Sequence, residues 1–347
     1  MSGVSALQRL DRYQREHGRL GLPLGVLYKF FDDRGTQLAA TLTYYAFVAL
    51  FPLLLLFFSA AGFLLQGDPT LRSELESSAL RNIPMLSSQL RDNLGSFHGS
   101  TLGIVVGVLG TLYGGTGVMQ VAQVGLNHIY GVPRNEERNP LRSRLRSLVL
   151  LALLGTAVLL STGVTVALAT ANGLTSELGL ALHALGYLFS FALALALFTG
   201  AFMLLTAPAL APAQVLRGAL FAAAMWELLQ VGGAAYVTHE LHHANQLYGT
   251  FAIVLGTIGW IYLQSLVLVF GAELNVVLEL RLWPRALLTP FTDTAELTPA
   301  DRRAYSLYAA AQRFKGFEHV QASFEDQPAH AEDPPPELPE PARERST

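Results

Sequence analysis

The chain has 347 residues, of which 51% are hydrophobic and only 14% are charged, whereas about a quarter of the residues are charged in an ordinary soluble domain. The formal net charge is −3 and cysteine is absent. These values exclude disulfides, thiolate nucleophiles and cysteine-based metal centres, and they give no support for nucleic-acid binding. The charges gather between long uncharged stretches, a pattern typical of an integral membrane protein.

Six apolar runs are long enough to cross the hydrocarbon core of a bilayer, which takes about 20 helical residues. The sequence therefore predicts an all-α polytopic membrane protein, with about six spanning helices over residues 37–283. An N-terminal segment (1–36) and a tail (284–347) flank this domain. The six expected spans lie at residues 38–65, 101–130, 145–171, 180–206, 216–237 and 249–278.

Two shorter helices are expected outside the spans. Leu86, Leu90 and Leu94 recur every four residues in the first loop, which predicts a short amphipathic helix there. Thr298 is followed by proline, alanine and aspartate, a typical helix start, so a second short helix is expected near 299–316. The proline- and glutamate-rich end of the chain is expected to be disordered.

The basic residues are distributed unevenly among the segments between the spans. Of the 23 lysines and arginines, 20 lie in the terminal segments and in every second loop, and 3 lie in the other loops. Because basic residues favour the cytoplasmic side of a membrane, we expect both termini in the cytoplasm. The arginines of the second loop could contact RNA, but their place between two spans favours topology determinants that also contact anionic lipid headgroups. The candidates for headgroup contact are Arg138, Arg142, Arg144 and Arg146.

Acidic residues inside the expected spans are candidates for function. Glu227 falls near the middle of the fifth span, where a charged side chain costs about 2.5–3.5 kcal/mol on insertion scales. The alternative is a protonated glutamate that bonds to a neighbouring helix as a structural link. Glu273 and Asn275 lie toward the cytoplasmic end of the sixth span, where Glu273 could also be an ordinary interfacial carboxylate.

Polar residues of two other spans share this depth. Gln120, Gln123 and Asn127 form one stripe on the cytoplasmic half of the second span, and Tyr44 lies at a similar depth on the first. Together with the acidic residues they predict a polar vestibule that is open to the cytoplasm, with Glu227 at its floor. The alternative interpretation is hydrogen bonding between helices.

Small residues recur in steps of three and four along the second and sixth spans, which indicates close helix packing. We expect these two helices to meet at the centre of the bundle and to bring the polar residues together. The small residues are Gly103, Gly107, Gly110, Gly114 and Gly117 in the second span, and Gly249, Ala252, Gly256 and Gly259 in the sixth.

His239, Glu240 and His243 match the H-E-x-x-H pattern, in which two histidines bind zinc and the glutamate acts as a base. The pattern falls at the outer end of the fifth span, and no third ligand follows it nearby. We therefore interpret it as a chance match and expect no metal or other cofactor, with a zinc metalloprotease or incidental metal binding as the alternatives.

Short motifs lie along the chain at residues 39–45, 50–52, 125–132, 217–219, 226–227, 248–249, 260–262 and 271–275. Together they resemble the YihY/BrkB family of bacterial inner-membrane proteins, over roughly residues 25–283 in the family's order. The resemblance implies a six-helix fold in the cytoplasmic membrane, and no settled activity. Members carry labels as serum-resistance or virulence factors and as ribonuclease-like proteins. No acid–base constellation in a soluble segment supports ribonuclease activity here.

Three functions are compatible with these features. The leading hypothesis is a transporter-like or lipid-handling protein without enzymatic activity, whose partners are membrane lipids and not nucleic acid, and which could form a homo-oligomer. The second is a scaffold that binds envelope machinery without transport. The third is the membrane metalloprotease.

Overall fold

The computed structural model describes residues 11–15, 18–64, 101–170, 176–207, 209–240, 249–289, 292 and 295–324. Every regular element in these ranges is helical. The long helices have 29 to 32 residues each. They are α3 (Gly35–Leu64), α6 (Thr101–Ile129), α7 (Pro140–Thr170), α8 (Ser176–Leu205), α9 (Pro212–Glu240) and α10 (Gly249–Leu280). The shorter elements are α2 (Gly18–Asp32), the 3₁₀ helix η3 (Arg134–Glu136) and α11 (Pro299–Ala311).

The expected membrane fold is confirmed. Five of the long helices contain segments that are long and apolar enough to cross a bilayer. The remaining expected span, residues 145–171, falls on α7, whose 31 residues are within the length range of the other long helices. Some side chains of α7 lie outside the described residues. The protein is therefore an all-α polytopic membrane protein. The five segments are Gly35–Leu56, Val105–Ile129, Ala184–Leu205, Pro212–Gly233 and Val254–Leu280.

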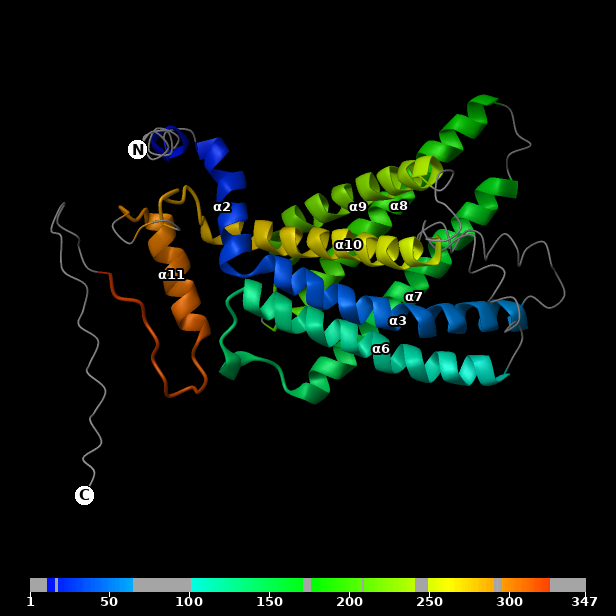
Figure 1. Ribbon diagram of the computed structural model, residues 1–347, viewed down its shortest axis with the longest axis horizontal. Helices are drawn as coiled ribbons and strands as arrows, with labels where there is room; N and C mark the ends of the chain where they lie inside the picture. Colours follow the sequence, from blue (N-terminus) through cyan, green and yellow to red (C-terminus); the bar gives the residue numbers. More distant parts are fainter. Residues whose placement is uncertain are drawn as a thin grey trace, which may run out of the picture.

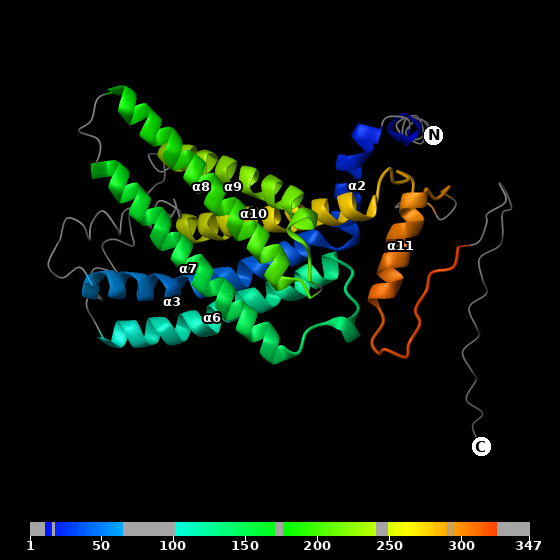
Figure 2. The ribbon, with the colours of Figure 1, turned by 180° about the vertical axis from the view of Figure 1, so that it is seen from behind.

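The long helices pack side by side in a closed order. The most extensive contacts among them follow the order α6–α3–α10–α9–α8–α7 and back to α6, and α6 also makes smaller contacts with α8 and α10. Toward the end away from α2, α7 and α8 diverge from α3 and α6 (Figures 1 and 2).

The glycine face of α6 packs against α3 and not against α10, so the expected central pairing of the second and sixth spans is wrong. A Cβ atom on Gly107 would lie 2.7 Å from the backbone of Leu56, and one on Gly110 would lie 2.6 Å from the Pro52 side chain. Gly259 of α10, by contrast, has no neighbouring atom within 4 Å of a Cβ position. The small residues of α6 therefore serve the α3–α6 contact.

Helices α9 and α10 approach each other closely through a second pair of glycines. A Cβ atom on Gly218 would lie 2.0 Å from the carbonyl oxygen of Gly271, so no larger residue fits at this crossing without displacing a helix. Gly218 N also donates a hydrogen bond of 2.6 Å to Asn275 Oδ1.

The segments that carry most of the described arginines and lysines meet at one end of the bundle, which we call the basic end: α2, residues 131–146, residues 209–217, residues 281–289 and residues 295–315 (Figure 1). The expected tail helix is present here as α11. It begins as predicted, because Thr298 and Asp301 form a reciprocal capping box, but it ends at Ala311 and not near residue 316. The amphipathic helix expected around Leu86–Leu94 lies outside the described residues.

Candidate functional site

The polar residues that the sequence assigns to one vestibule lie in separate places. The amides of α6 line a cleft beside α7, and the polar residues of α10 are buried against α2 and α9. Glu227 and Tyr44 belong to neither group. The prediction of a single vestibule between α6 and α10 is therefore wrong, because α3 packs on the glycine face of α6 that was expected to contact α10.

A cleft of about 230 Å³ lies at the basic end between α6, the start of α7 and the end of α8. Gln120, Gln123 and Asn127 contribute one side of its lining, and Arg138 and Arg144 contribute another. The predicted stripe and two of the predicted headgroup-contact arginines thus share one space, which we call the α6–α7 cleft. Its other lining residues are Val124, Glu137, Pro140, Ser143, Leu205 and Ala207.

Two of the three amides hold the walls of this cleft in place. Gln123 Nε2 donates hydrogen bonds to Ser147 Oγ at 2.8 Å and to the Ser143 carbonyl at 3.1 Å, which ties α6 to α7. Asn127 Oδ1 accepts a hydrogen bond of 2.7 Å from the backbone N–H of Ala207, after α8. These contacts agree with the alternative interpretation of the stripe, hydrogen bonding between helices.

The four arginines of this region have different surroundings. Arg138 Nη1 donates to the carbonyl oxygen of Leu204 at 2.8 Å, and Arg146 Nη1 lies 3.4 Å from the same oxygen. A positive charge is favourable at this C-terminal end of α8. Burial, together with the nearby charge of Arg146, lowers the pKa of Arg138. Arg142 and Arg144 are exposed, and of these two only Arg144 lines the cleft.

Glu273 lies in a buried cluster that the sequence did not reveal. Its side chain is 0% exposed, so the interpretation as an ordinary interfacial carboxylate is wrong. Lys29 Nζ lies 3.4 Å from Glu273 Oε2, pairs with the carboxylate of Asp33, and donates to the Ile129 carbonyl at 2.8 Å. We call Lys29, Asp33 and Glu273 the Lys29 cluster. Burial raises the pKa of Asp33, although the adjacent Lys29 charge lowers it.

The sequence analysis did not identify Lys29 and Asp33 as site residues. It interpreted the basic residues before the first span only as determinants of topology and assigned no role to Asp33. A signal was present: the two residues are four positions apart and have opposite charges, a spacing that brings side chains together on a helix. Nothing in the sequence indicated that this pair meets Glu273.

Asn275 connects three helices and lines a pocket of about 210 Å³ between α9 and α10, apart from the α6–α7 cleft. Its Oδ1 accepts from Gly218 N in α9, and its Nδ2 donates to the hydroxyl of Tyr130, just after α6, at 3.2 Å. Both partners lie far from Asn275 in the sequence. The residue is buried, so its hydrogen bonds stabilise the junction of α9, α10 and the end of α6.

Glu227 and Tyr44 have surroundings that differ from the predicted ones. Ser190 Oγ of α8 donates a hydrogen bond of 2.8 Å to Glu227 Oε1, and the glutamate is half-buried. This contact favours the structural link between helices over a site at the floor of a cavity. Tyr44 is 65% exposed, and its ring meets that of Tyr45 in a T-shaped, edge-to-face arrangement.

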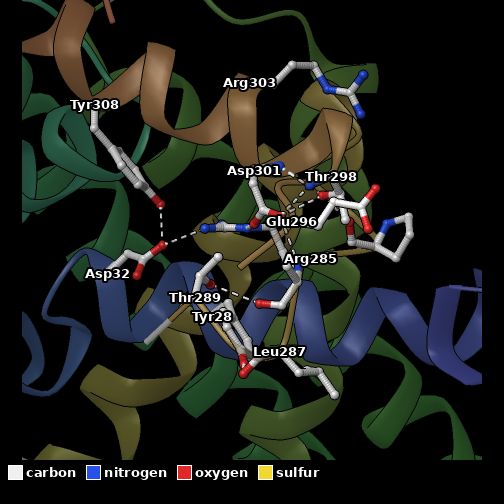
Figure 3. Close-up of polar contacts among 12 residues, drawn as sticks. Tyr28, Asp32, Arg285, Leu287, Thr289, Glu296, Thr298, Asp301, Arg303 and Tyr308 are labelled. Atoms are coloured by element: carbon white, nitrogen blue, oxygen red, sulfur yellow. Dashed lines mark hydrogen bonds and ion pairs between the residues drawn. The ribbon is translucent and has the colours of Figure 1, made fainter. Parts of the chain in front are cut away.

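A second buried charge cluster fastens α11 to α2 and to the segment that follows α10 (Figure 3). Arg285 Nε donates to Asp301 Oδ1 at 2.5 Å, and Arg285 Nη2 lies 3.1 Å from Asp32 Oδ2. Tyr308 donates to the same Asp32 oxygen at 3.0 Å. Burial alone would lower the pKa of Arg285, but its hydrogen bond to Asp301 and the charge of Asp32 outweigh burial and raise it. We call these four residues the Arg285 network.

The zincin-like stretch is not tested by the structure. His239 and Glu240 end α9, but their side chains and residues 241–248 lie outside the described residues. The interpretation of this stretch as a chance match remains a prediction.

Comparisons with known proteins place the chain among bacterial membrane proteins. A family model described as Virulence factor BrkB matches residues 26–290. The inner membrane protein YhjD of Escherichia coli is 33% identical over 91 residues, which cover 25% of this chain and 27% of that protein. A UPF0761 membrane protein of Azotobacter vinelandii is 29% identical over 263 residues, which cover 71% of this chain and 60% of that protein. The aligned part is therefore less than two thirds of either relative, and no solved structure matches the chain significantly.

Proposed function

This chain belongs to the Virulence factor BrkB family of integral membrane proteins, and on that premise we propose that it binds and handles envelope phospholipids through the α6–α7 cleft. The observation that carries the proposal is the pairing, in one cleft, of two arginines with amide and apolar side chains. The cleft lies where α6 ends and α7 begins, which is the depth of lipid headgroups for helices that span the bilayer.

The chemistry of the cleft suits a phosphate group. Arginine offers a planar set of N–H donors that bonds phosphate oxygens in pairs. Arg144 is exposed and can turn toward a ligand, whereas Arg138 is held at the end of α8. Arg138 lies near the like charge of Arg146, and a bound anion would offset the repulsion between the two guanidinium groups. Val124 and Leu205 supply apolar surface in the same lining.

We propose further that the basic end faces the cytoplasm and that the protein lies in the inner membrane, as the name of the E. coli relative states for that protein. The proposal for orientation is supported by the collection of basic segments at one end of the bundle. The chain lacks cysteine, so single cysteines can be introduced cleanly. A cysteine at Ser306 should react with an impermeant thiol reagent only after cells are opened. Labelling of intact cells would reverse the orientation.

The headgroup proposal is tested by comparing Arg144→Ala with Arg142→Ala. Both arginines are exposed on the first two turns of α7, but only Arg144 lines the cleft. The full chain would be placed in nanodiscs that contain phosphatidylglycerol with a photoreactive group near the phosphate. We expect Arg144→Ala to lower cross-linking several-fold and Arg142→Ala to leave it close to wild type.

Equal losses in the two variants would show that the arginines act only through general attraction to an anionic surface, and unchanged cross-linking in both would exclude the cleft as the binding site. Lipid movement is a separate measurement. Liposomes that contain the protein should exchange a fluorescent phospholipid between leaflets faster than empty liposomes, and Arg144→Ala should slow this exchange while Arg142→Ala should not.

A second candidate function, a scaffold for envelope machinery, is favoured by a separate groove. A groove of about 530 Å³ lies beside α11, outside the spans, and Pro133, Ser306, Arg313 and Glu318 are among its lining residues. A photoreactive residue at position 306 would test this function in cells. A defined protein cross-link there, together with no lipid exchange by the purified protein, would replace the lipid-handling proposal with the scaffold.

A further inference from the structure

The Lys29 cluster contains one positive and two potentially negative side chains in a buried space. Lys29 and Glu273 are 0% exposed and Asp33 is 3% exposed. Within the described part of the chain, Lys29 supplies the only ammonium or guanidinium group at ion-pair distance from either carboxylate. If all three groups were ionised, the cluster would hold a buried net charge of one electron, which proteins avoid by neutralising a group.

The Lys29 ammonium group lies closer to the carboxylate of Asp33 than to that of Glu273. Its Nζ bonds closely to Asp33 and donates to the Ile129 carbonyl at 2.8 Å, whereas Glu273 Oε2 lies 3.4 Å away. A hydrogen bond between charged groups is normally about 2.7–2.9 Å long. Neither oxygen of Glu273 has a hydrogen-bond partner among the described residues. Glu273 is therefore the carboxylate with the longer and weaker contact to the lysine.

The other ionisable groups around the cluster do not supply the missing charge. Asp32 and Tyr308 bond to each other within the Arg285 network, Tyr130 accepts from Asn275, and His128 is exposed at the surface of α6. The exposed ring of His128 is screened by solvent, so its charge acts weakly on a buried carboxylate.

We propose that Glu273 is a proton-binding site: at neutral pH its carboxylate binds one proton, while Asp33 and Lys29 remain an ion pair. The proton comes from the aqueous phase at the basic end and forms an O–H bond on a Glu273 oxygen, so the charge of the cluster changes from minus one to zero. The site joins α2, α10 and, through the Ile129 carbonyl, the end of α6. It does not require the lipid-binding proposal, because the cluster is separate from the α6–α7 cleft.

Infrared spectroscopy tests the site directly in the full chain reconstituted into lipid nanodiscs. A protonated carboxyl group gives a C=O stretching band that shifts in deuterium oxide, and glutamate labelled with carbon-13 at its side-chain carboxyl shifts the band only if a glutamate carries the proton. At neutral pH we expect a band that is sensitive to the glutamate label and is lost in Glu273→Gln. The matched control Glu227→Gln changes another intramembrane glutamate and should leave the Glu273 band in place.

The charge argument adds a second variant with an expected result of its own. In Asp33→Asn the Lys29 charge is free to pair with Glu273, so Glu273 should ionise and its band should disappear although the residue is still present. The proposal would be overturned if the wild type showed no glutamate band, if Glu273→Gln left the glutamate band unchanged, or if Asp33→Asn left the Glu273-dependent band in place. If Glu273→Gln fails to fold, the glutamate label and Asp33→Asn still decide the question.

Discussion

Two arginine-containing regions lie at the same end of the bundle and use the same side chain differently. In the Arg285 network the guanidinium is 0% exposed and contacts two carboxylates from separate parts of the chain. In the α6–α7 cleft Arg144 is exposed, and Arg138 Nη1 donates to the carbonyl oxygen of Leu204. The difference shows that burial and acidic partners, not residue type, decide whether an arginine holds the fold or can receive a ligand.

The comparison also separates stability from binding. Removing one partner of a buried ion pair leaves a charge without compensation and is strongly destabilising, whereas exposed charges contribute little to stability. Substitutions in the Arg285 network should therefore loosen α11, and substitutions of exposed cleft residues should change ligand binding with the fold intact. The predictions that follow test this contrast, starting with the largest expected effect.

Arg285→Ala should have the largest effect on stability. It leaves the buried Asp301 carboxylate without its guanidinium partner, and breaking such a pair typically costs about 3–5 kcal/mol. Hydrogen exchange of the protein in detergent should then show loss of protection in α11, with the long helices still protected. Arg285→Lys keeps the charge but cannot contact Asp301 and Asp32 as a planar fork, so it should fall between wild type and Arg285→Ala.

Unchanged protection of α11 in Arg285→Ala would contradict the structural role of the network. It would mean that the capping box and apolar contacts alone hold α11, and the contrast between the two arginine regions would then no longer apply.

Gly218→Ala tests the close contact between α9 and α10. The added methyl group would collide with the Gly271 carbonyl and with Asn275, and overpacking of this kind costs about 1–3 kcal/mol. Gly232→Ala is the matched control on the same helix, because nothing lies within 4 Å of its Cβ position. Thermal unfolding should show a lower midpoint for Gly218→Ala and no decrease for Gly232→Ala. Equal midpoints would show that α9 and α10 can move apart to admit the methyl group without a loss of stability.

Thr298→Ala should have a smaller effect that is limited to α11. The Thr298 hydroxyl accepts from Asp301 N at the start of this helix, and removing such a cap costs about 1 kcal/mol. We expect hydrogen exchange to accelerate in the first turns of α11 while the rest of the protein is unchanged. Ser306→Ala, an exposed position on the same helix, is the control. A similar acceleration in both variants would show that the cap does not determine the local stability of α11.

Most of the fold follows from the sequence because hydrocarbon permits few alternatives. Every backbone polar group must be satisfied within the span, so a long uncharged run becomes a helix. The start of α11 was predictable for a similar reason, because a capping box is encoded within four residues. The order of the helices around the bundle was not predictable, since small residues indicate close packing without naming the partner. The glycines of α6 are an example: they pack on α3, although α10 was the expected partner.

The sites were predictable in part. The stripe on α6 and the arginines near α7 were recognised separately, and the structure brings both to one cleft. The two buried charge clusters were missed, because each joins residues that are far apart in the chain. Asp32 and Arg285, for example, are 253 positions apart. The sequence placed Glu227 deep in the bundle and Glu273 near its boundary, but their burial is the opposite. Glu227 is a half-buried hydrogen-bond acceptor, and Glu273 is fully buried beside Lys29.

The smallest expected effect on stability belongs to Arg144→Ala, which would complete the separation of binding from folding. Arg144 is exposed, and substitutions at exposed positions usually change the free energy of unfolding by less than about 0.5 kcal/mol. Arg138→Ala is the informative partner, because it also removes a hydrogen bond to Leu204 at the end of α8 and should cost about 1 kcal/mol. Thermal unfolding and phosphatidylglycerol cross-linking measured on the same samples should show lipid binding lowered in both variants and the midpoint lowered only in Arg138→Ala. A clear loss of stability in Arg144→Ala would mean that the cleft arginines hold the fold as Arg285 does, because removal of a charged side chain is strongly destabilising when that side chain has buried partners in the native state.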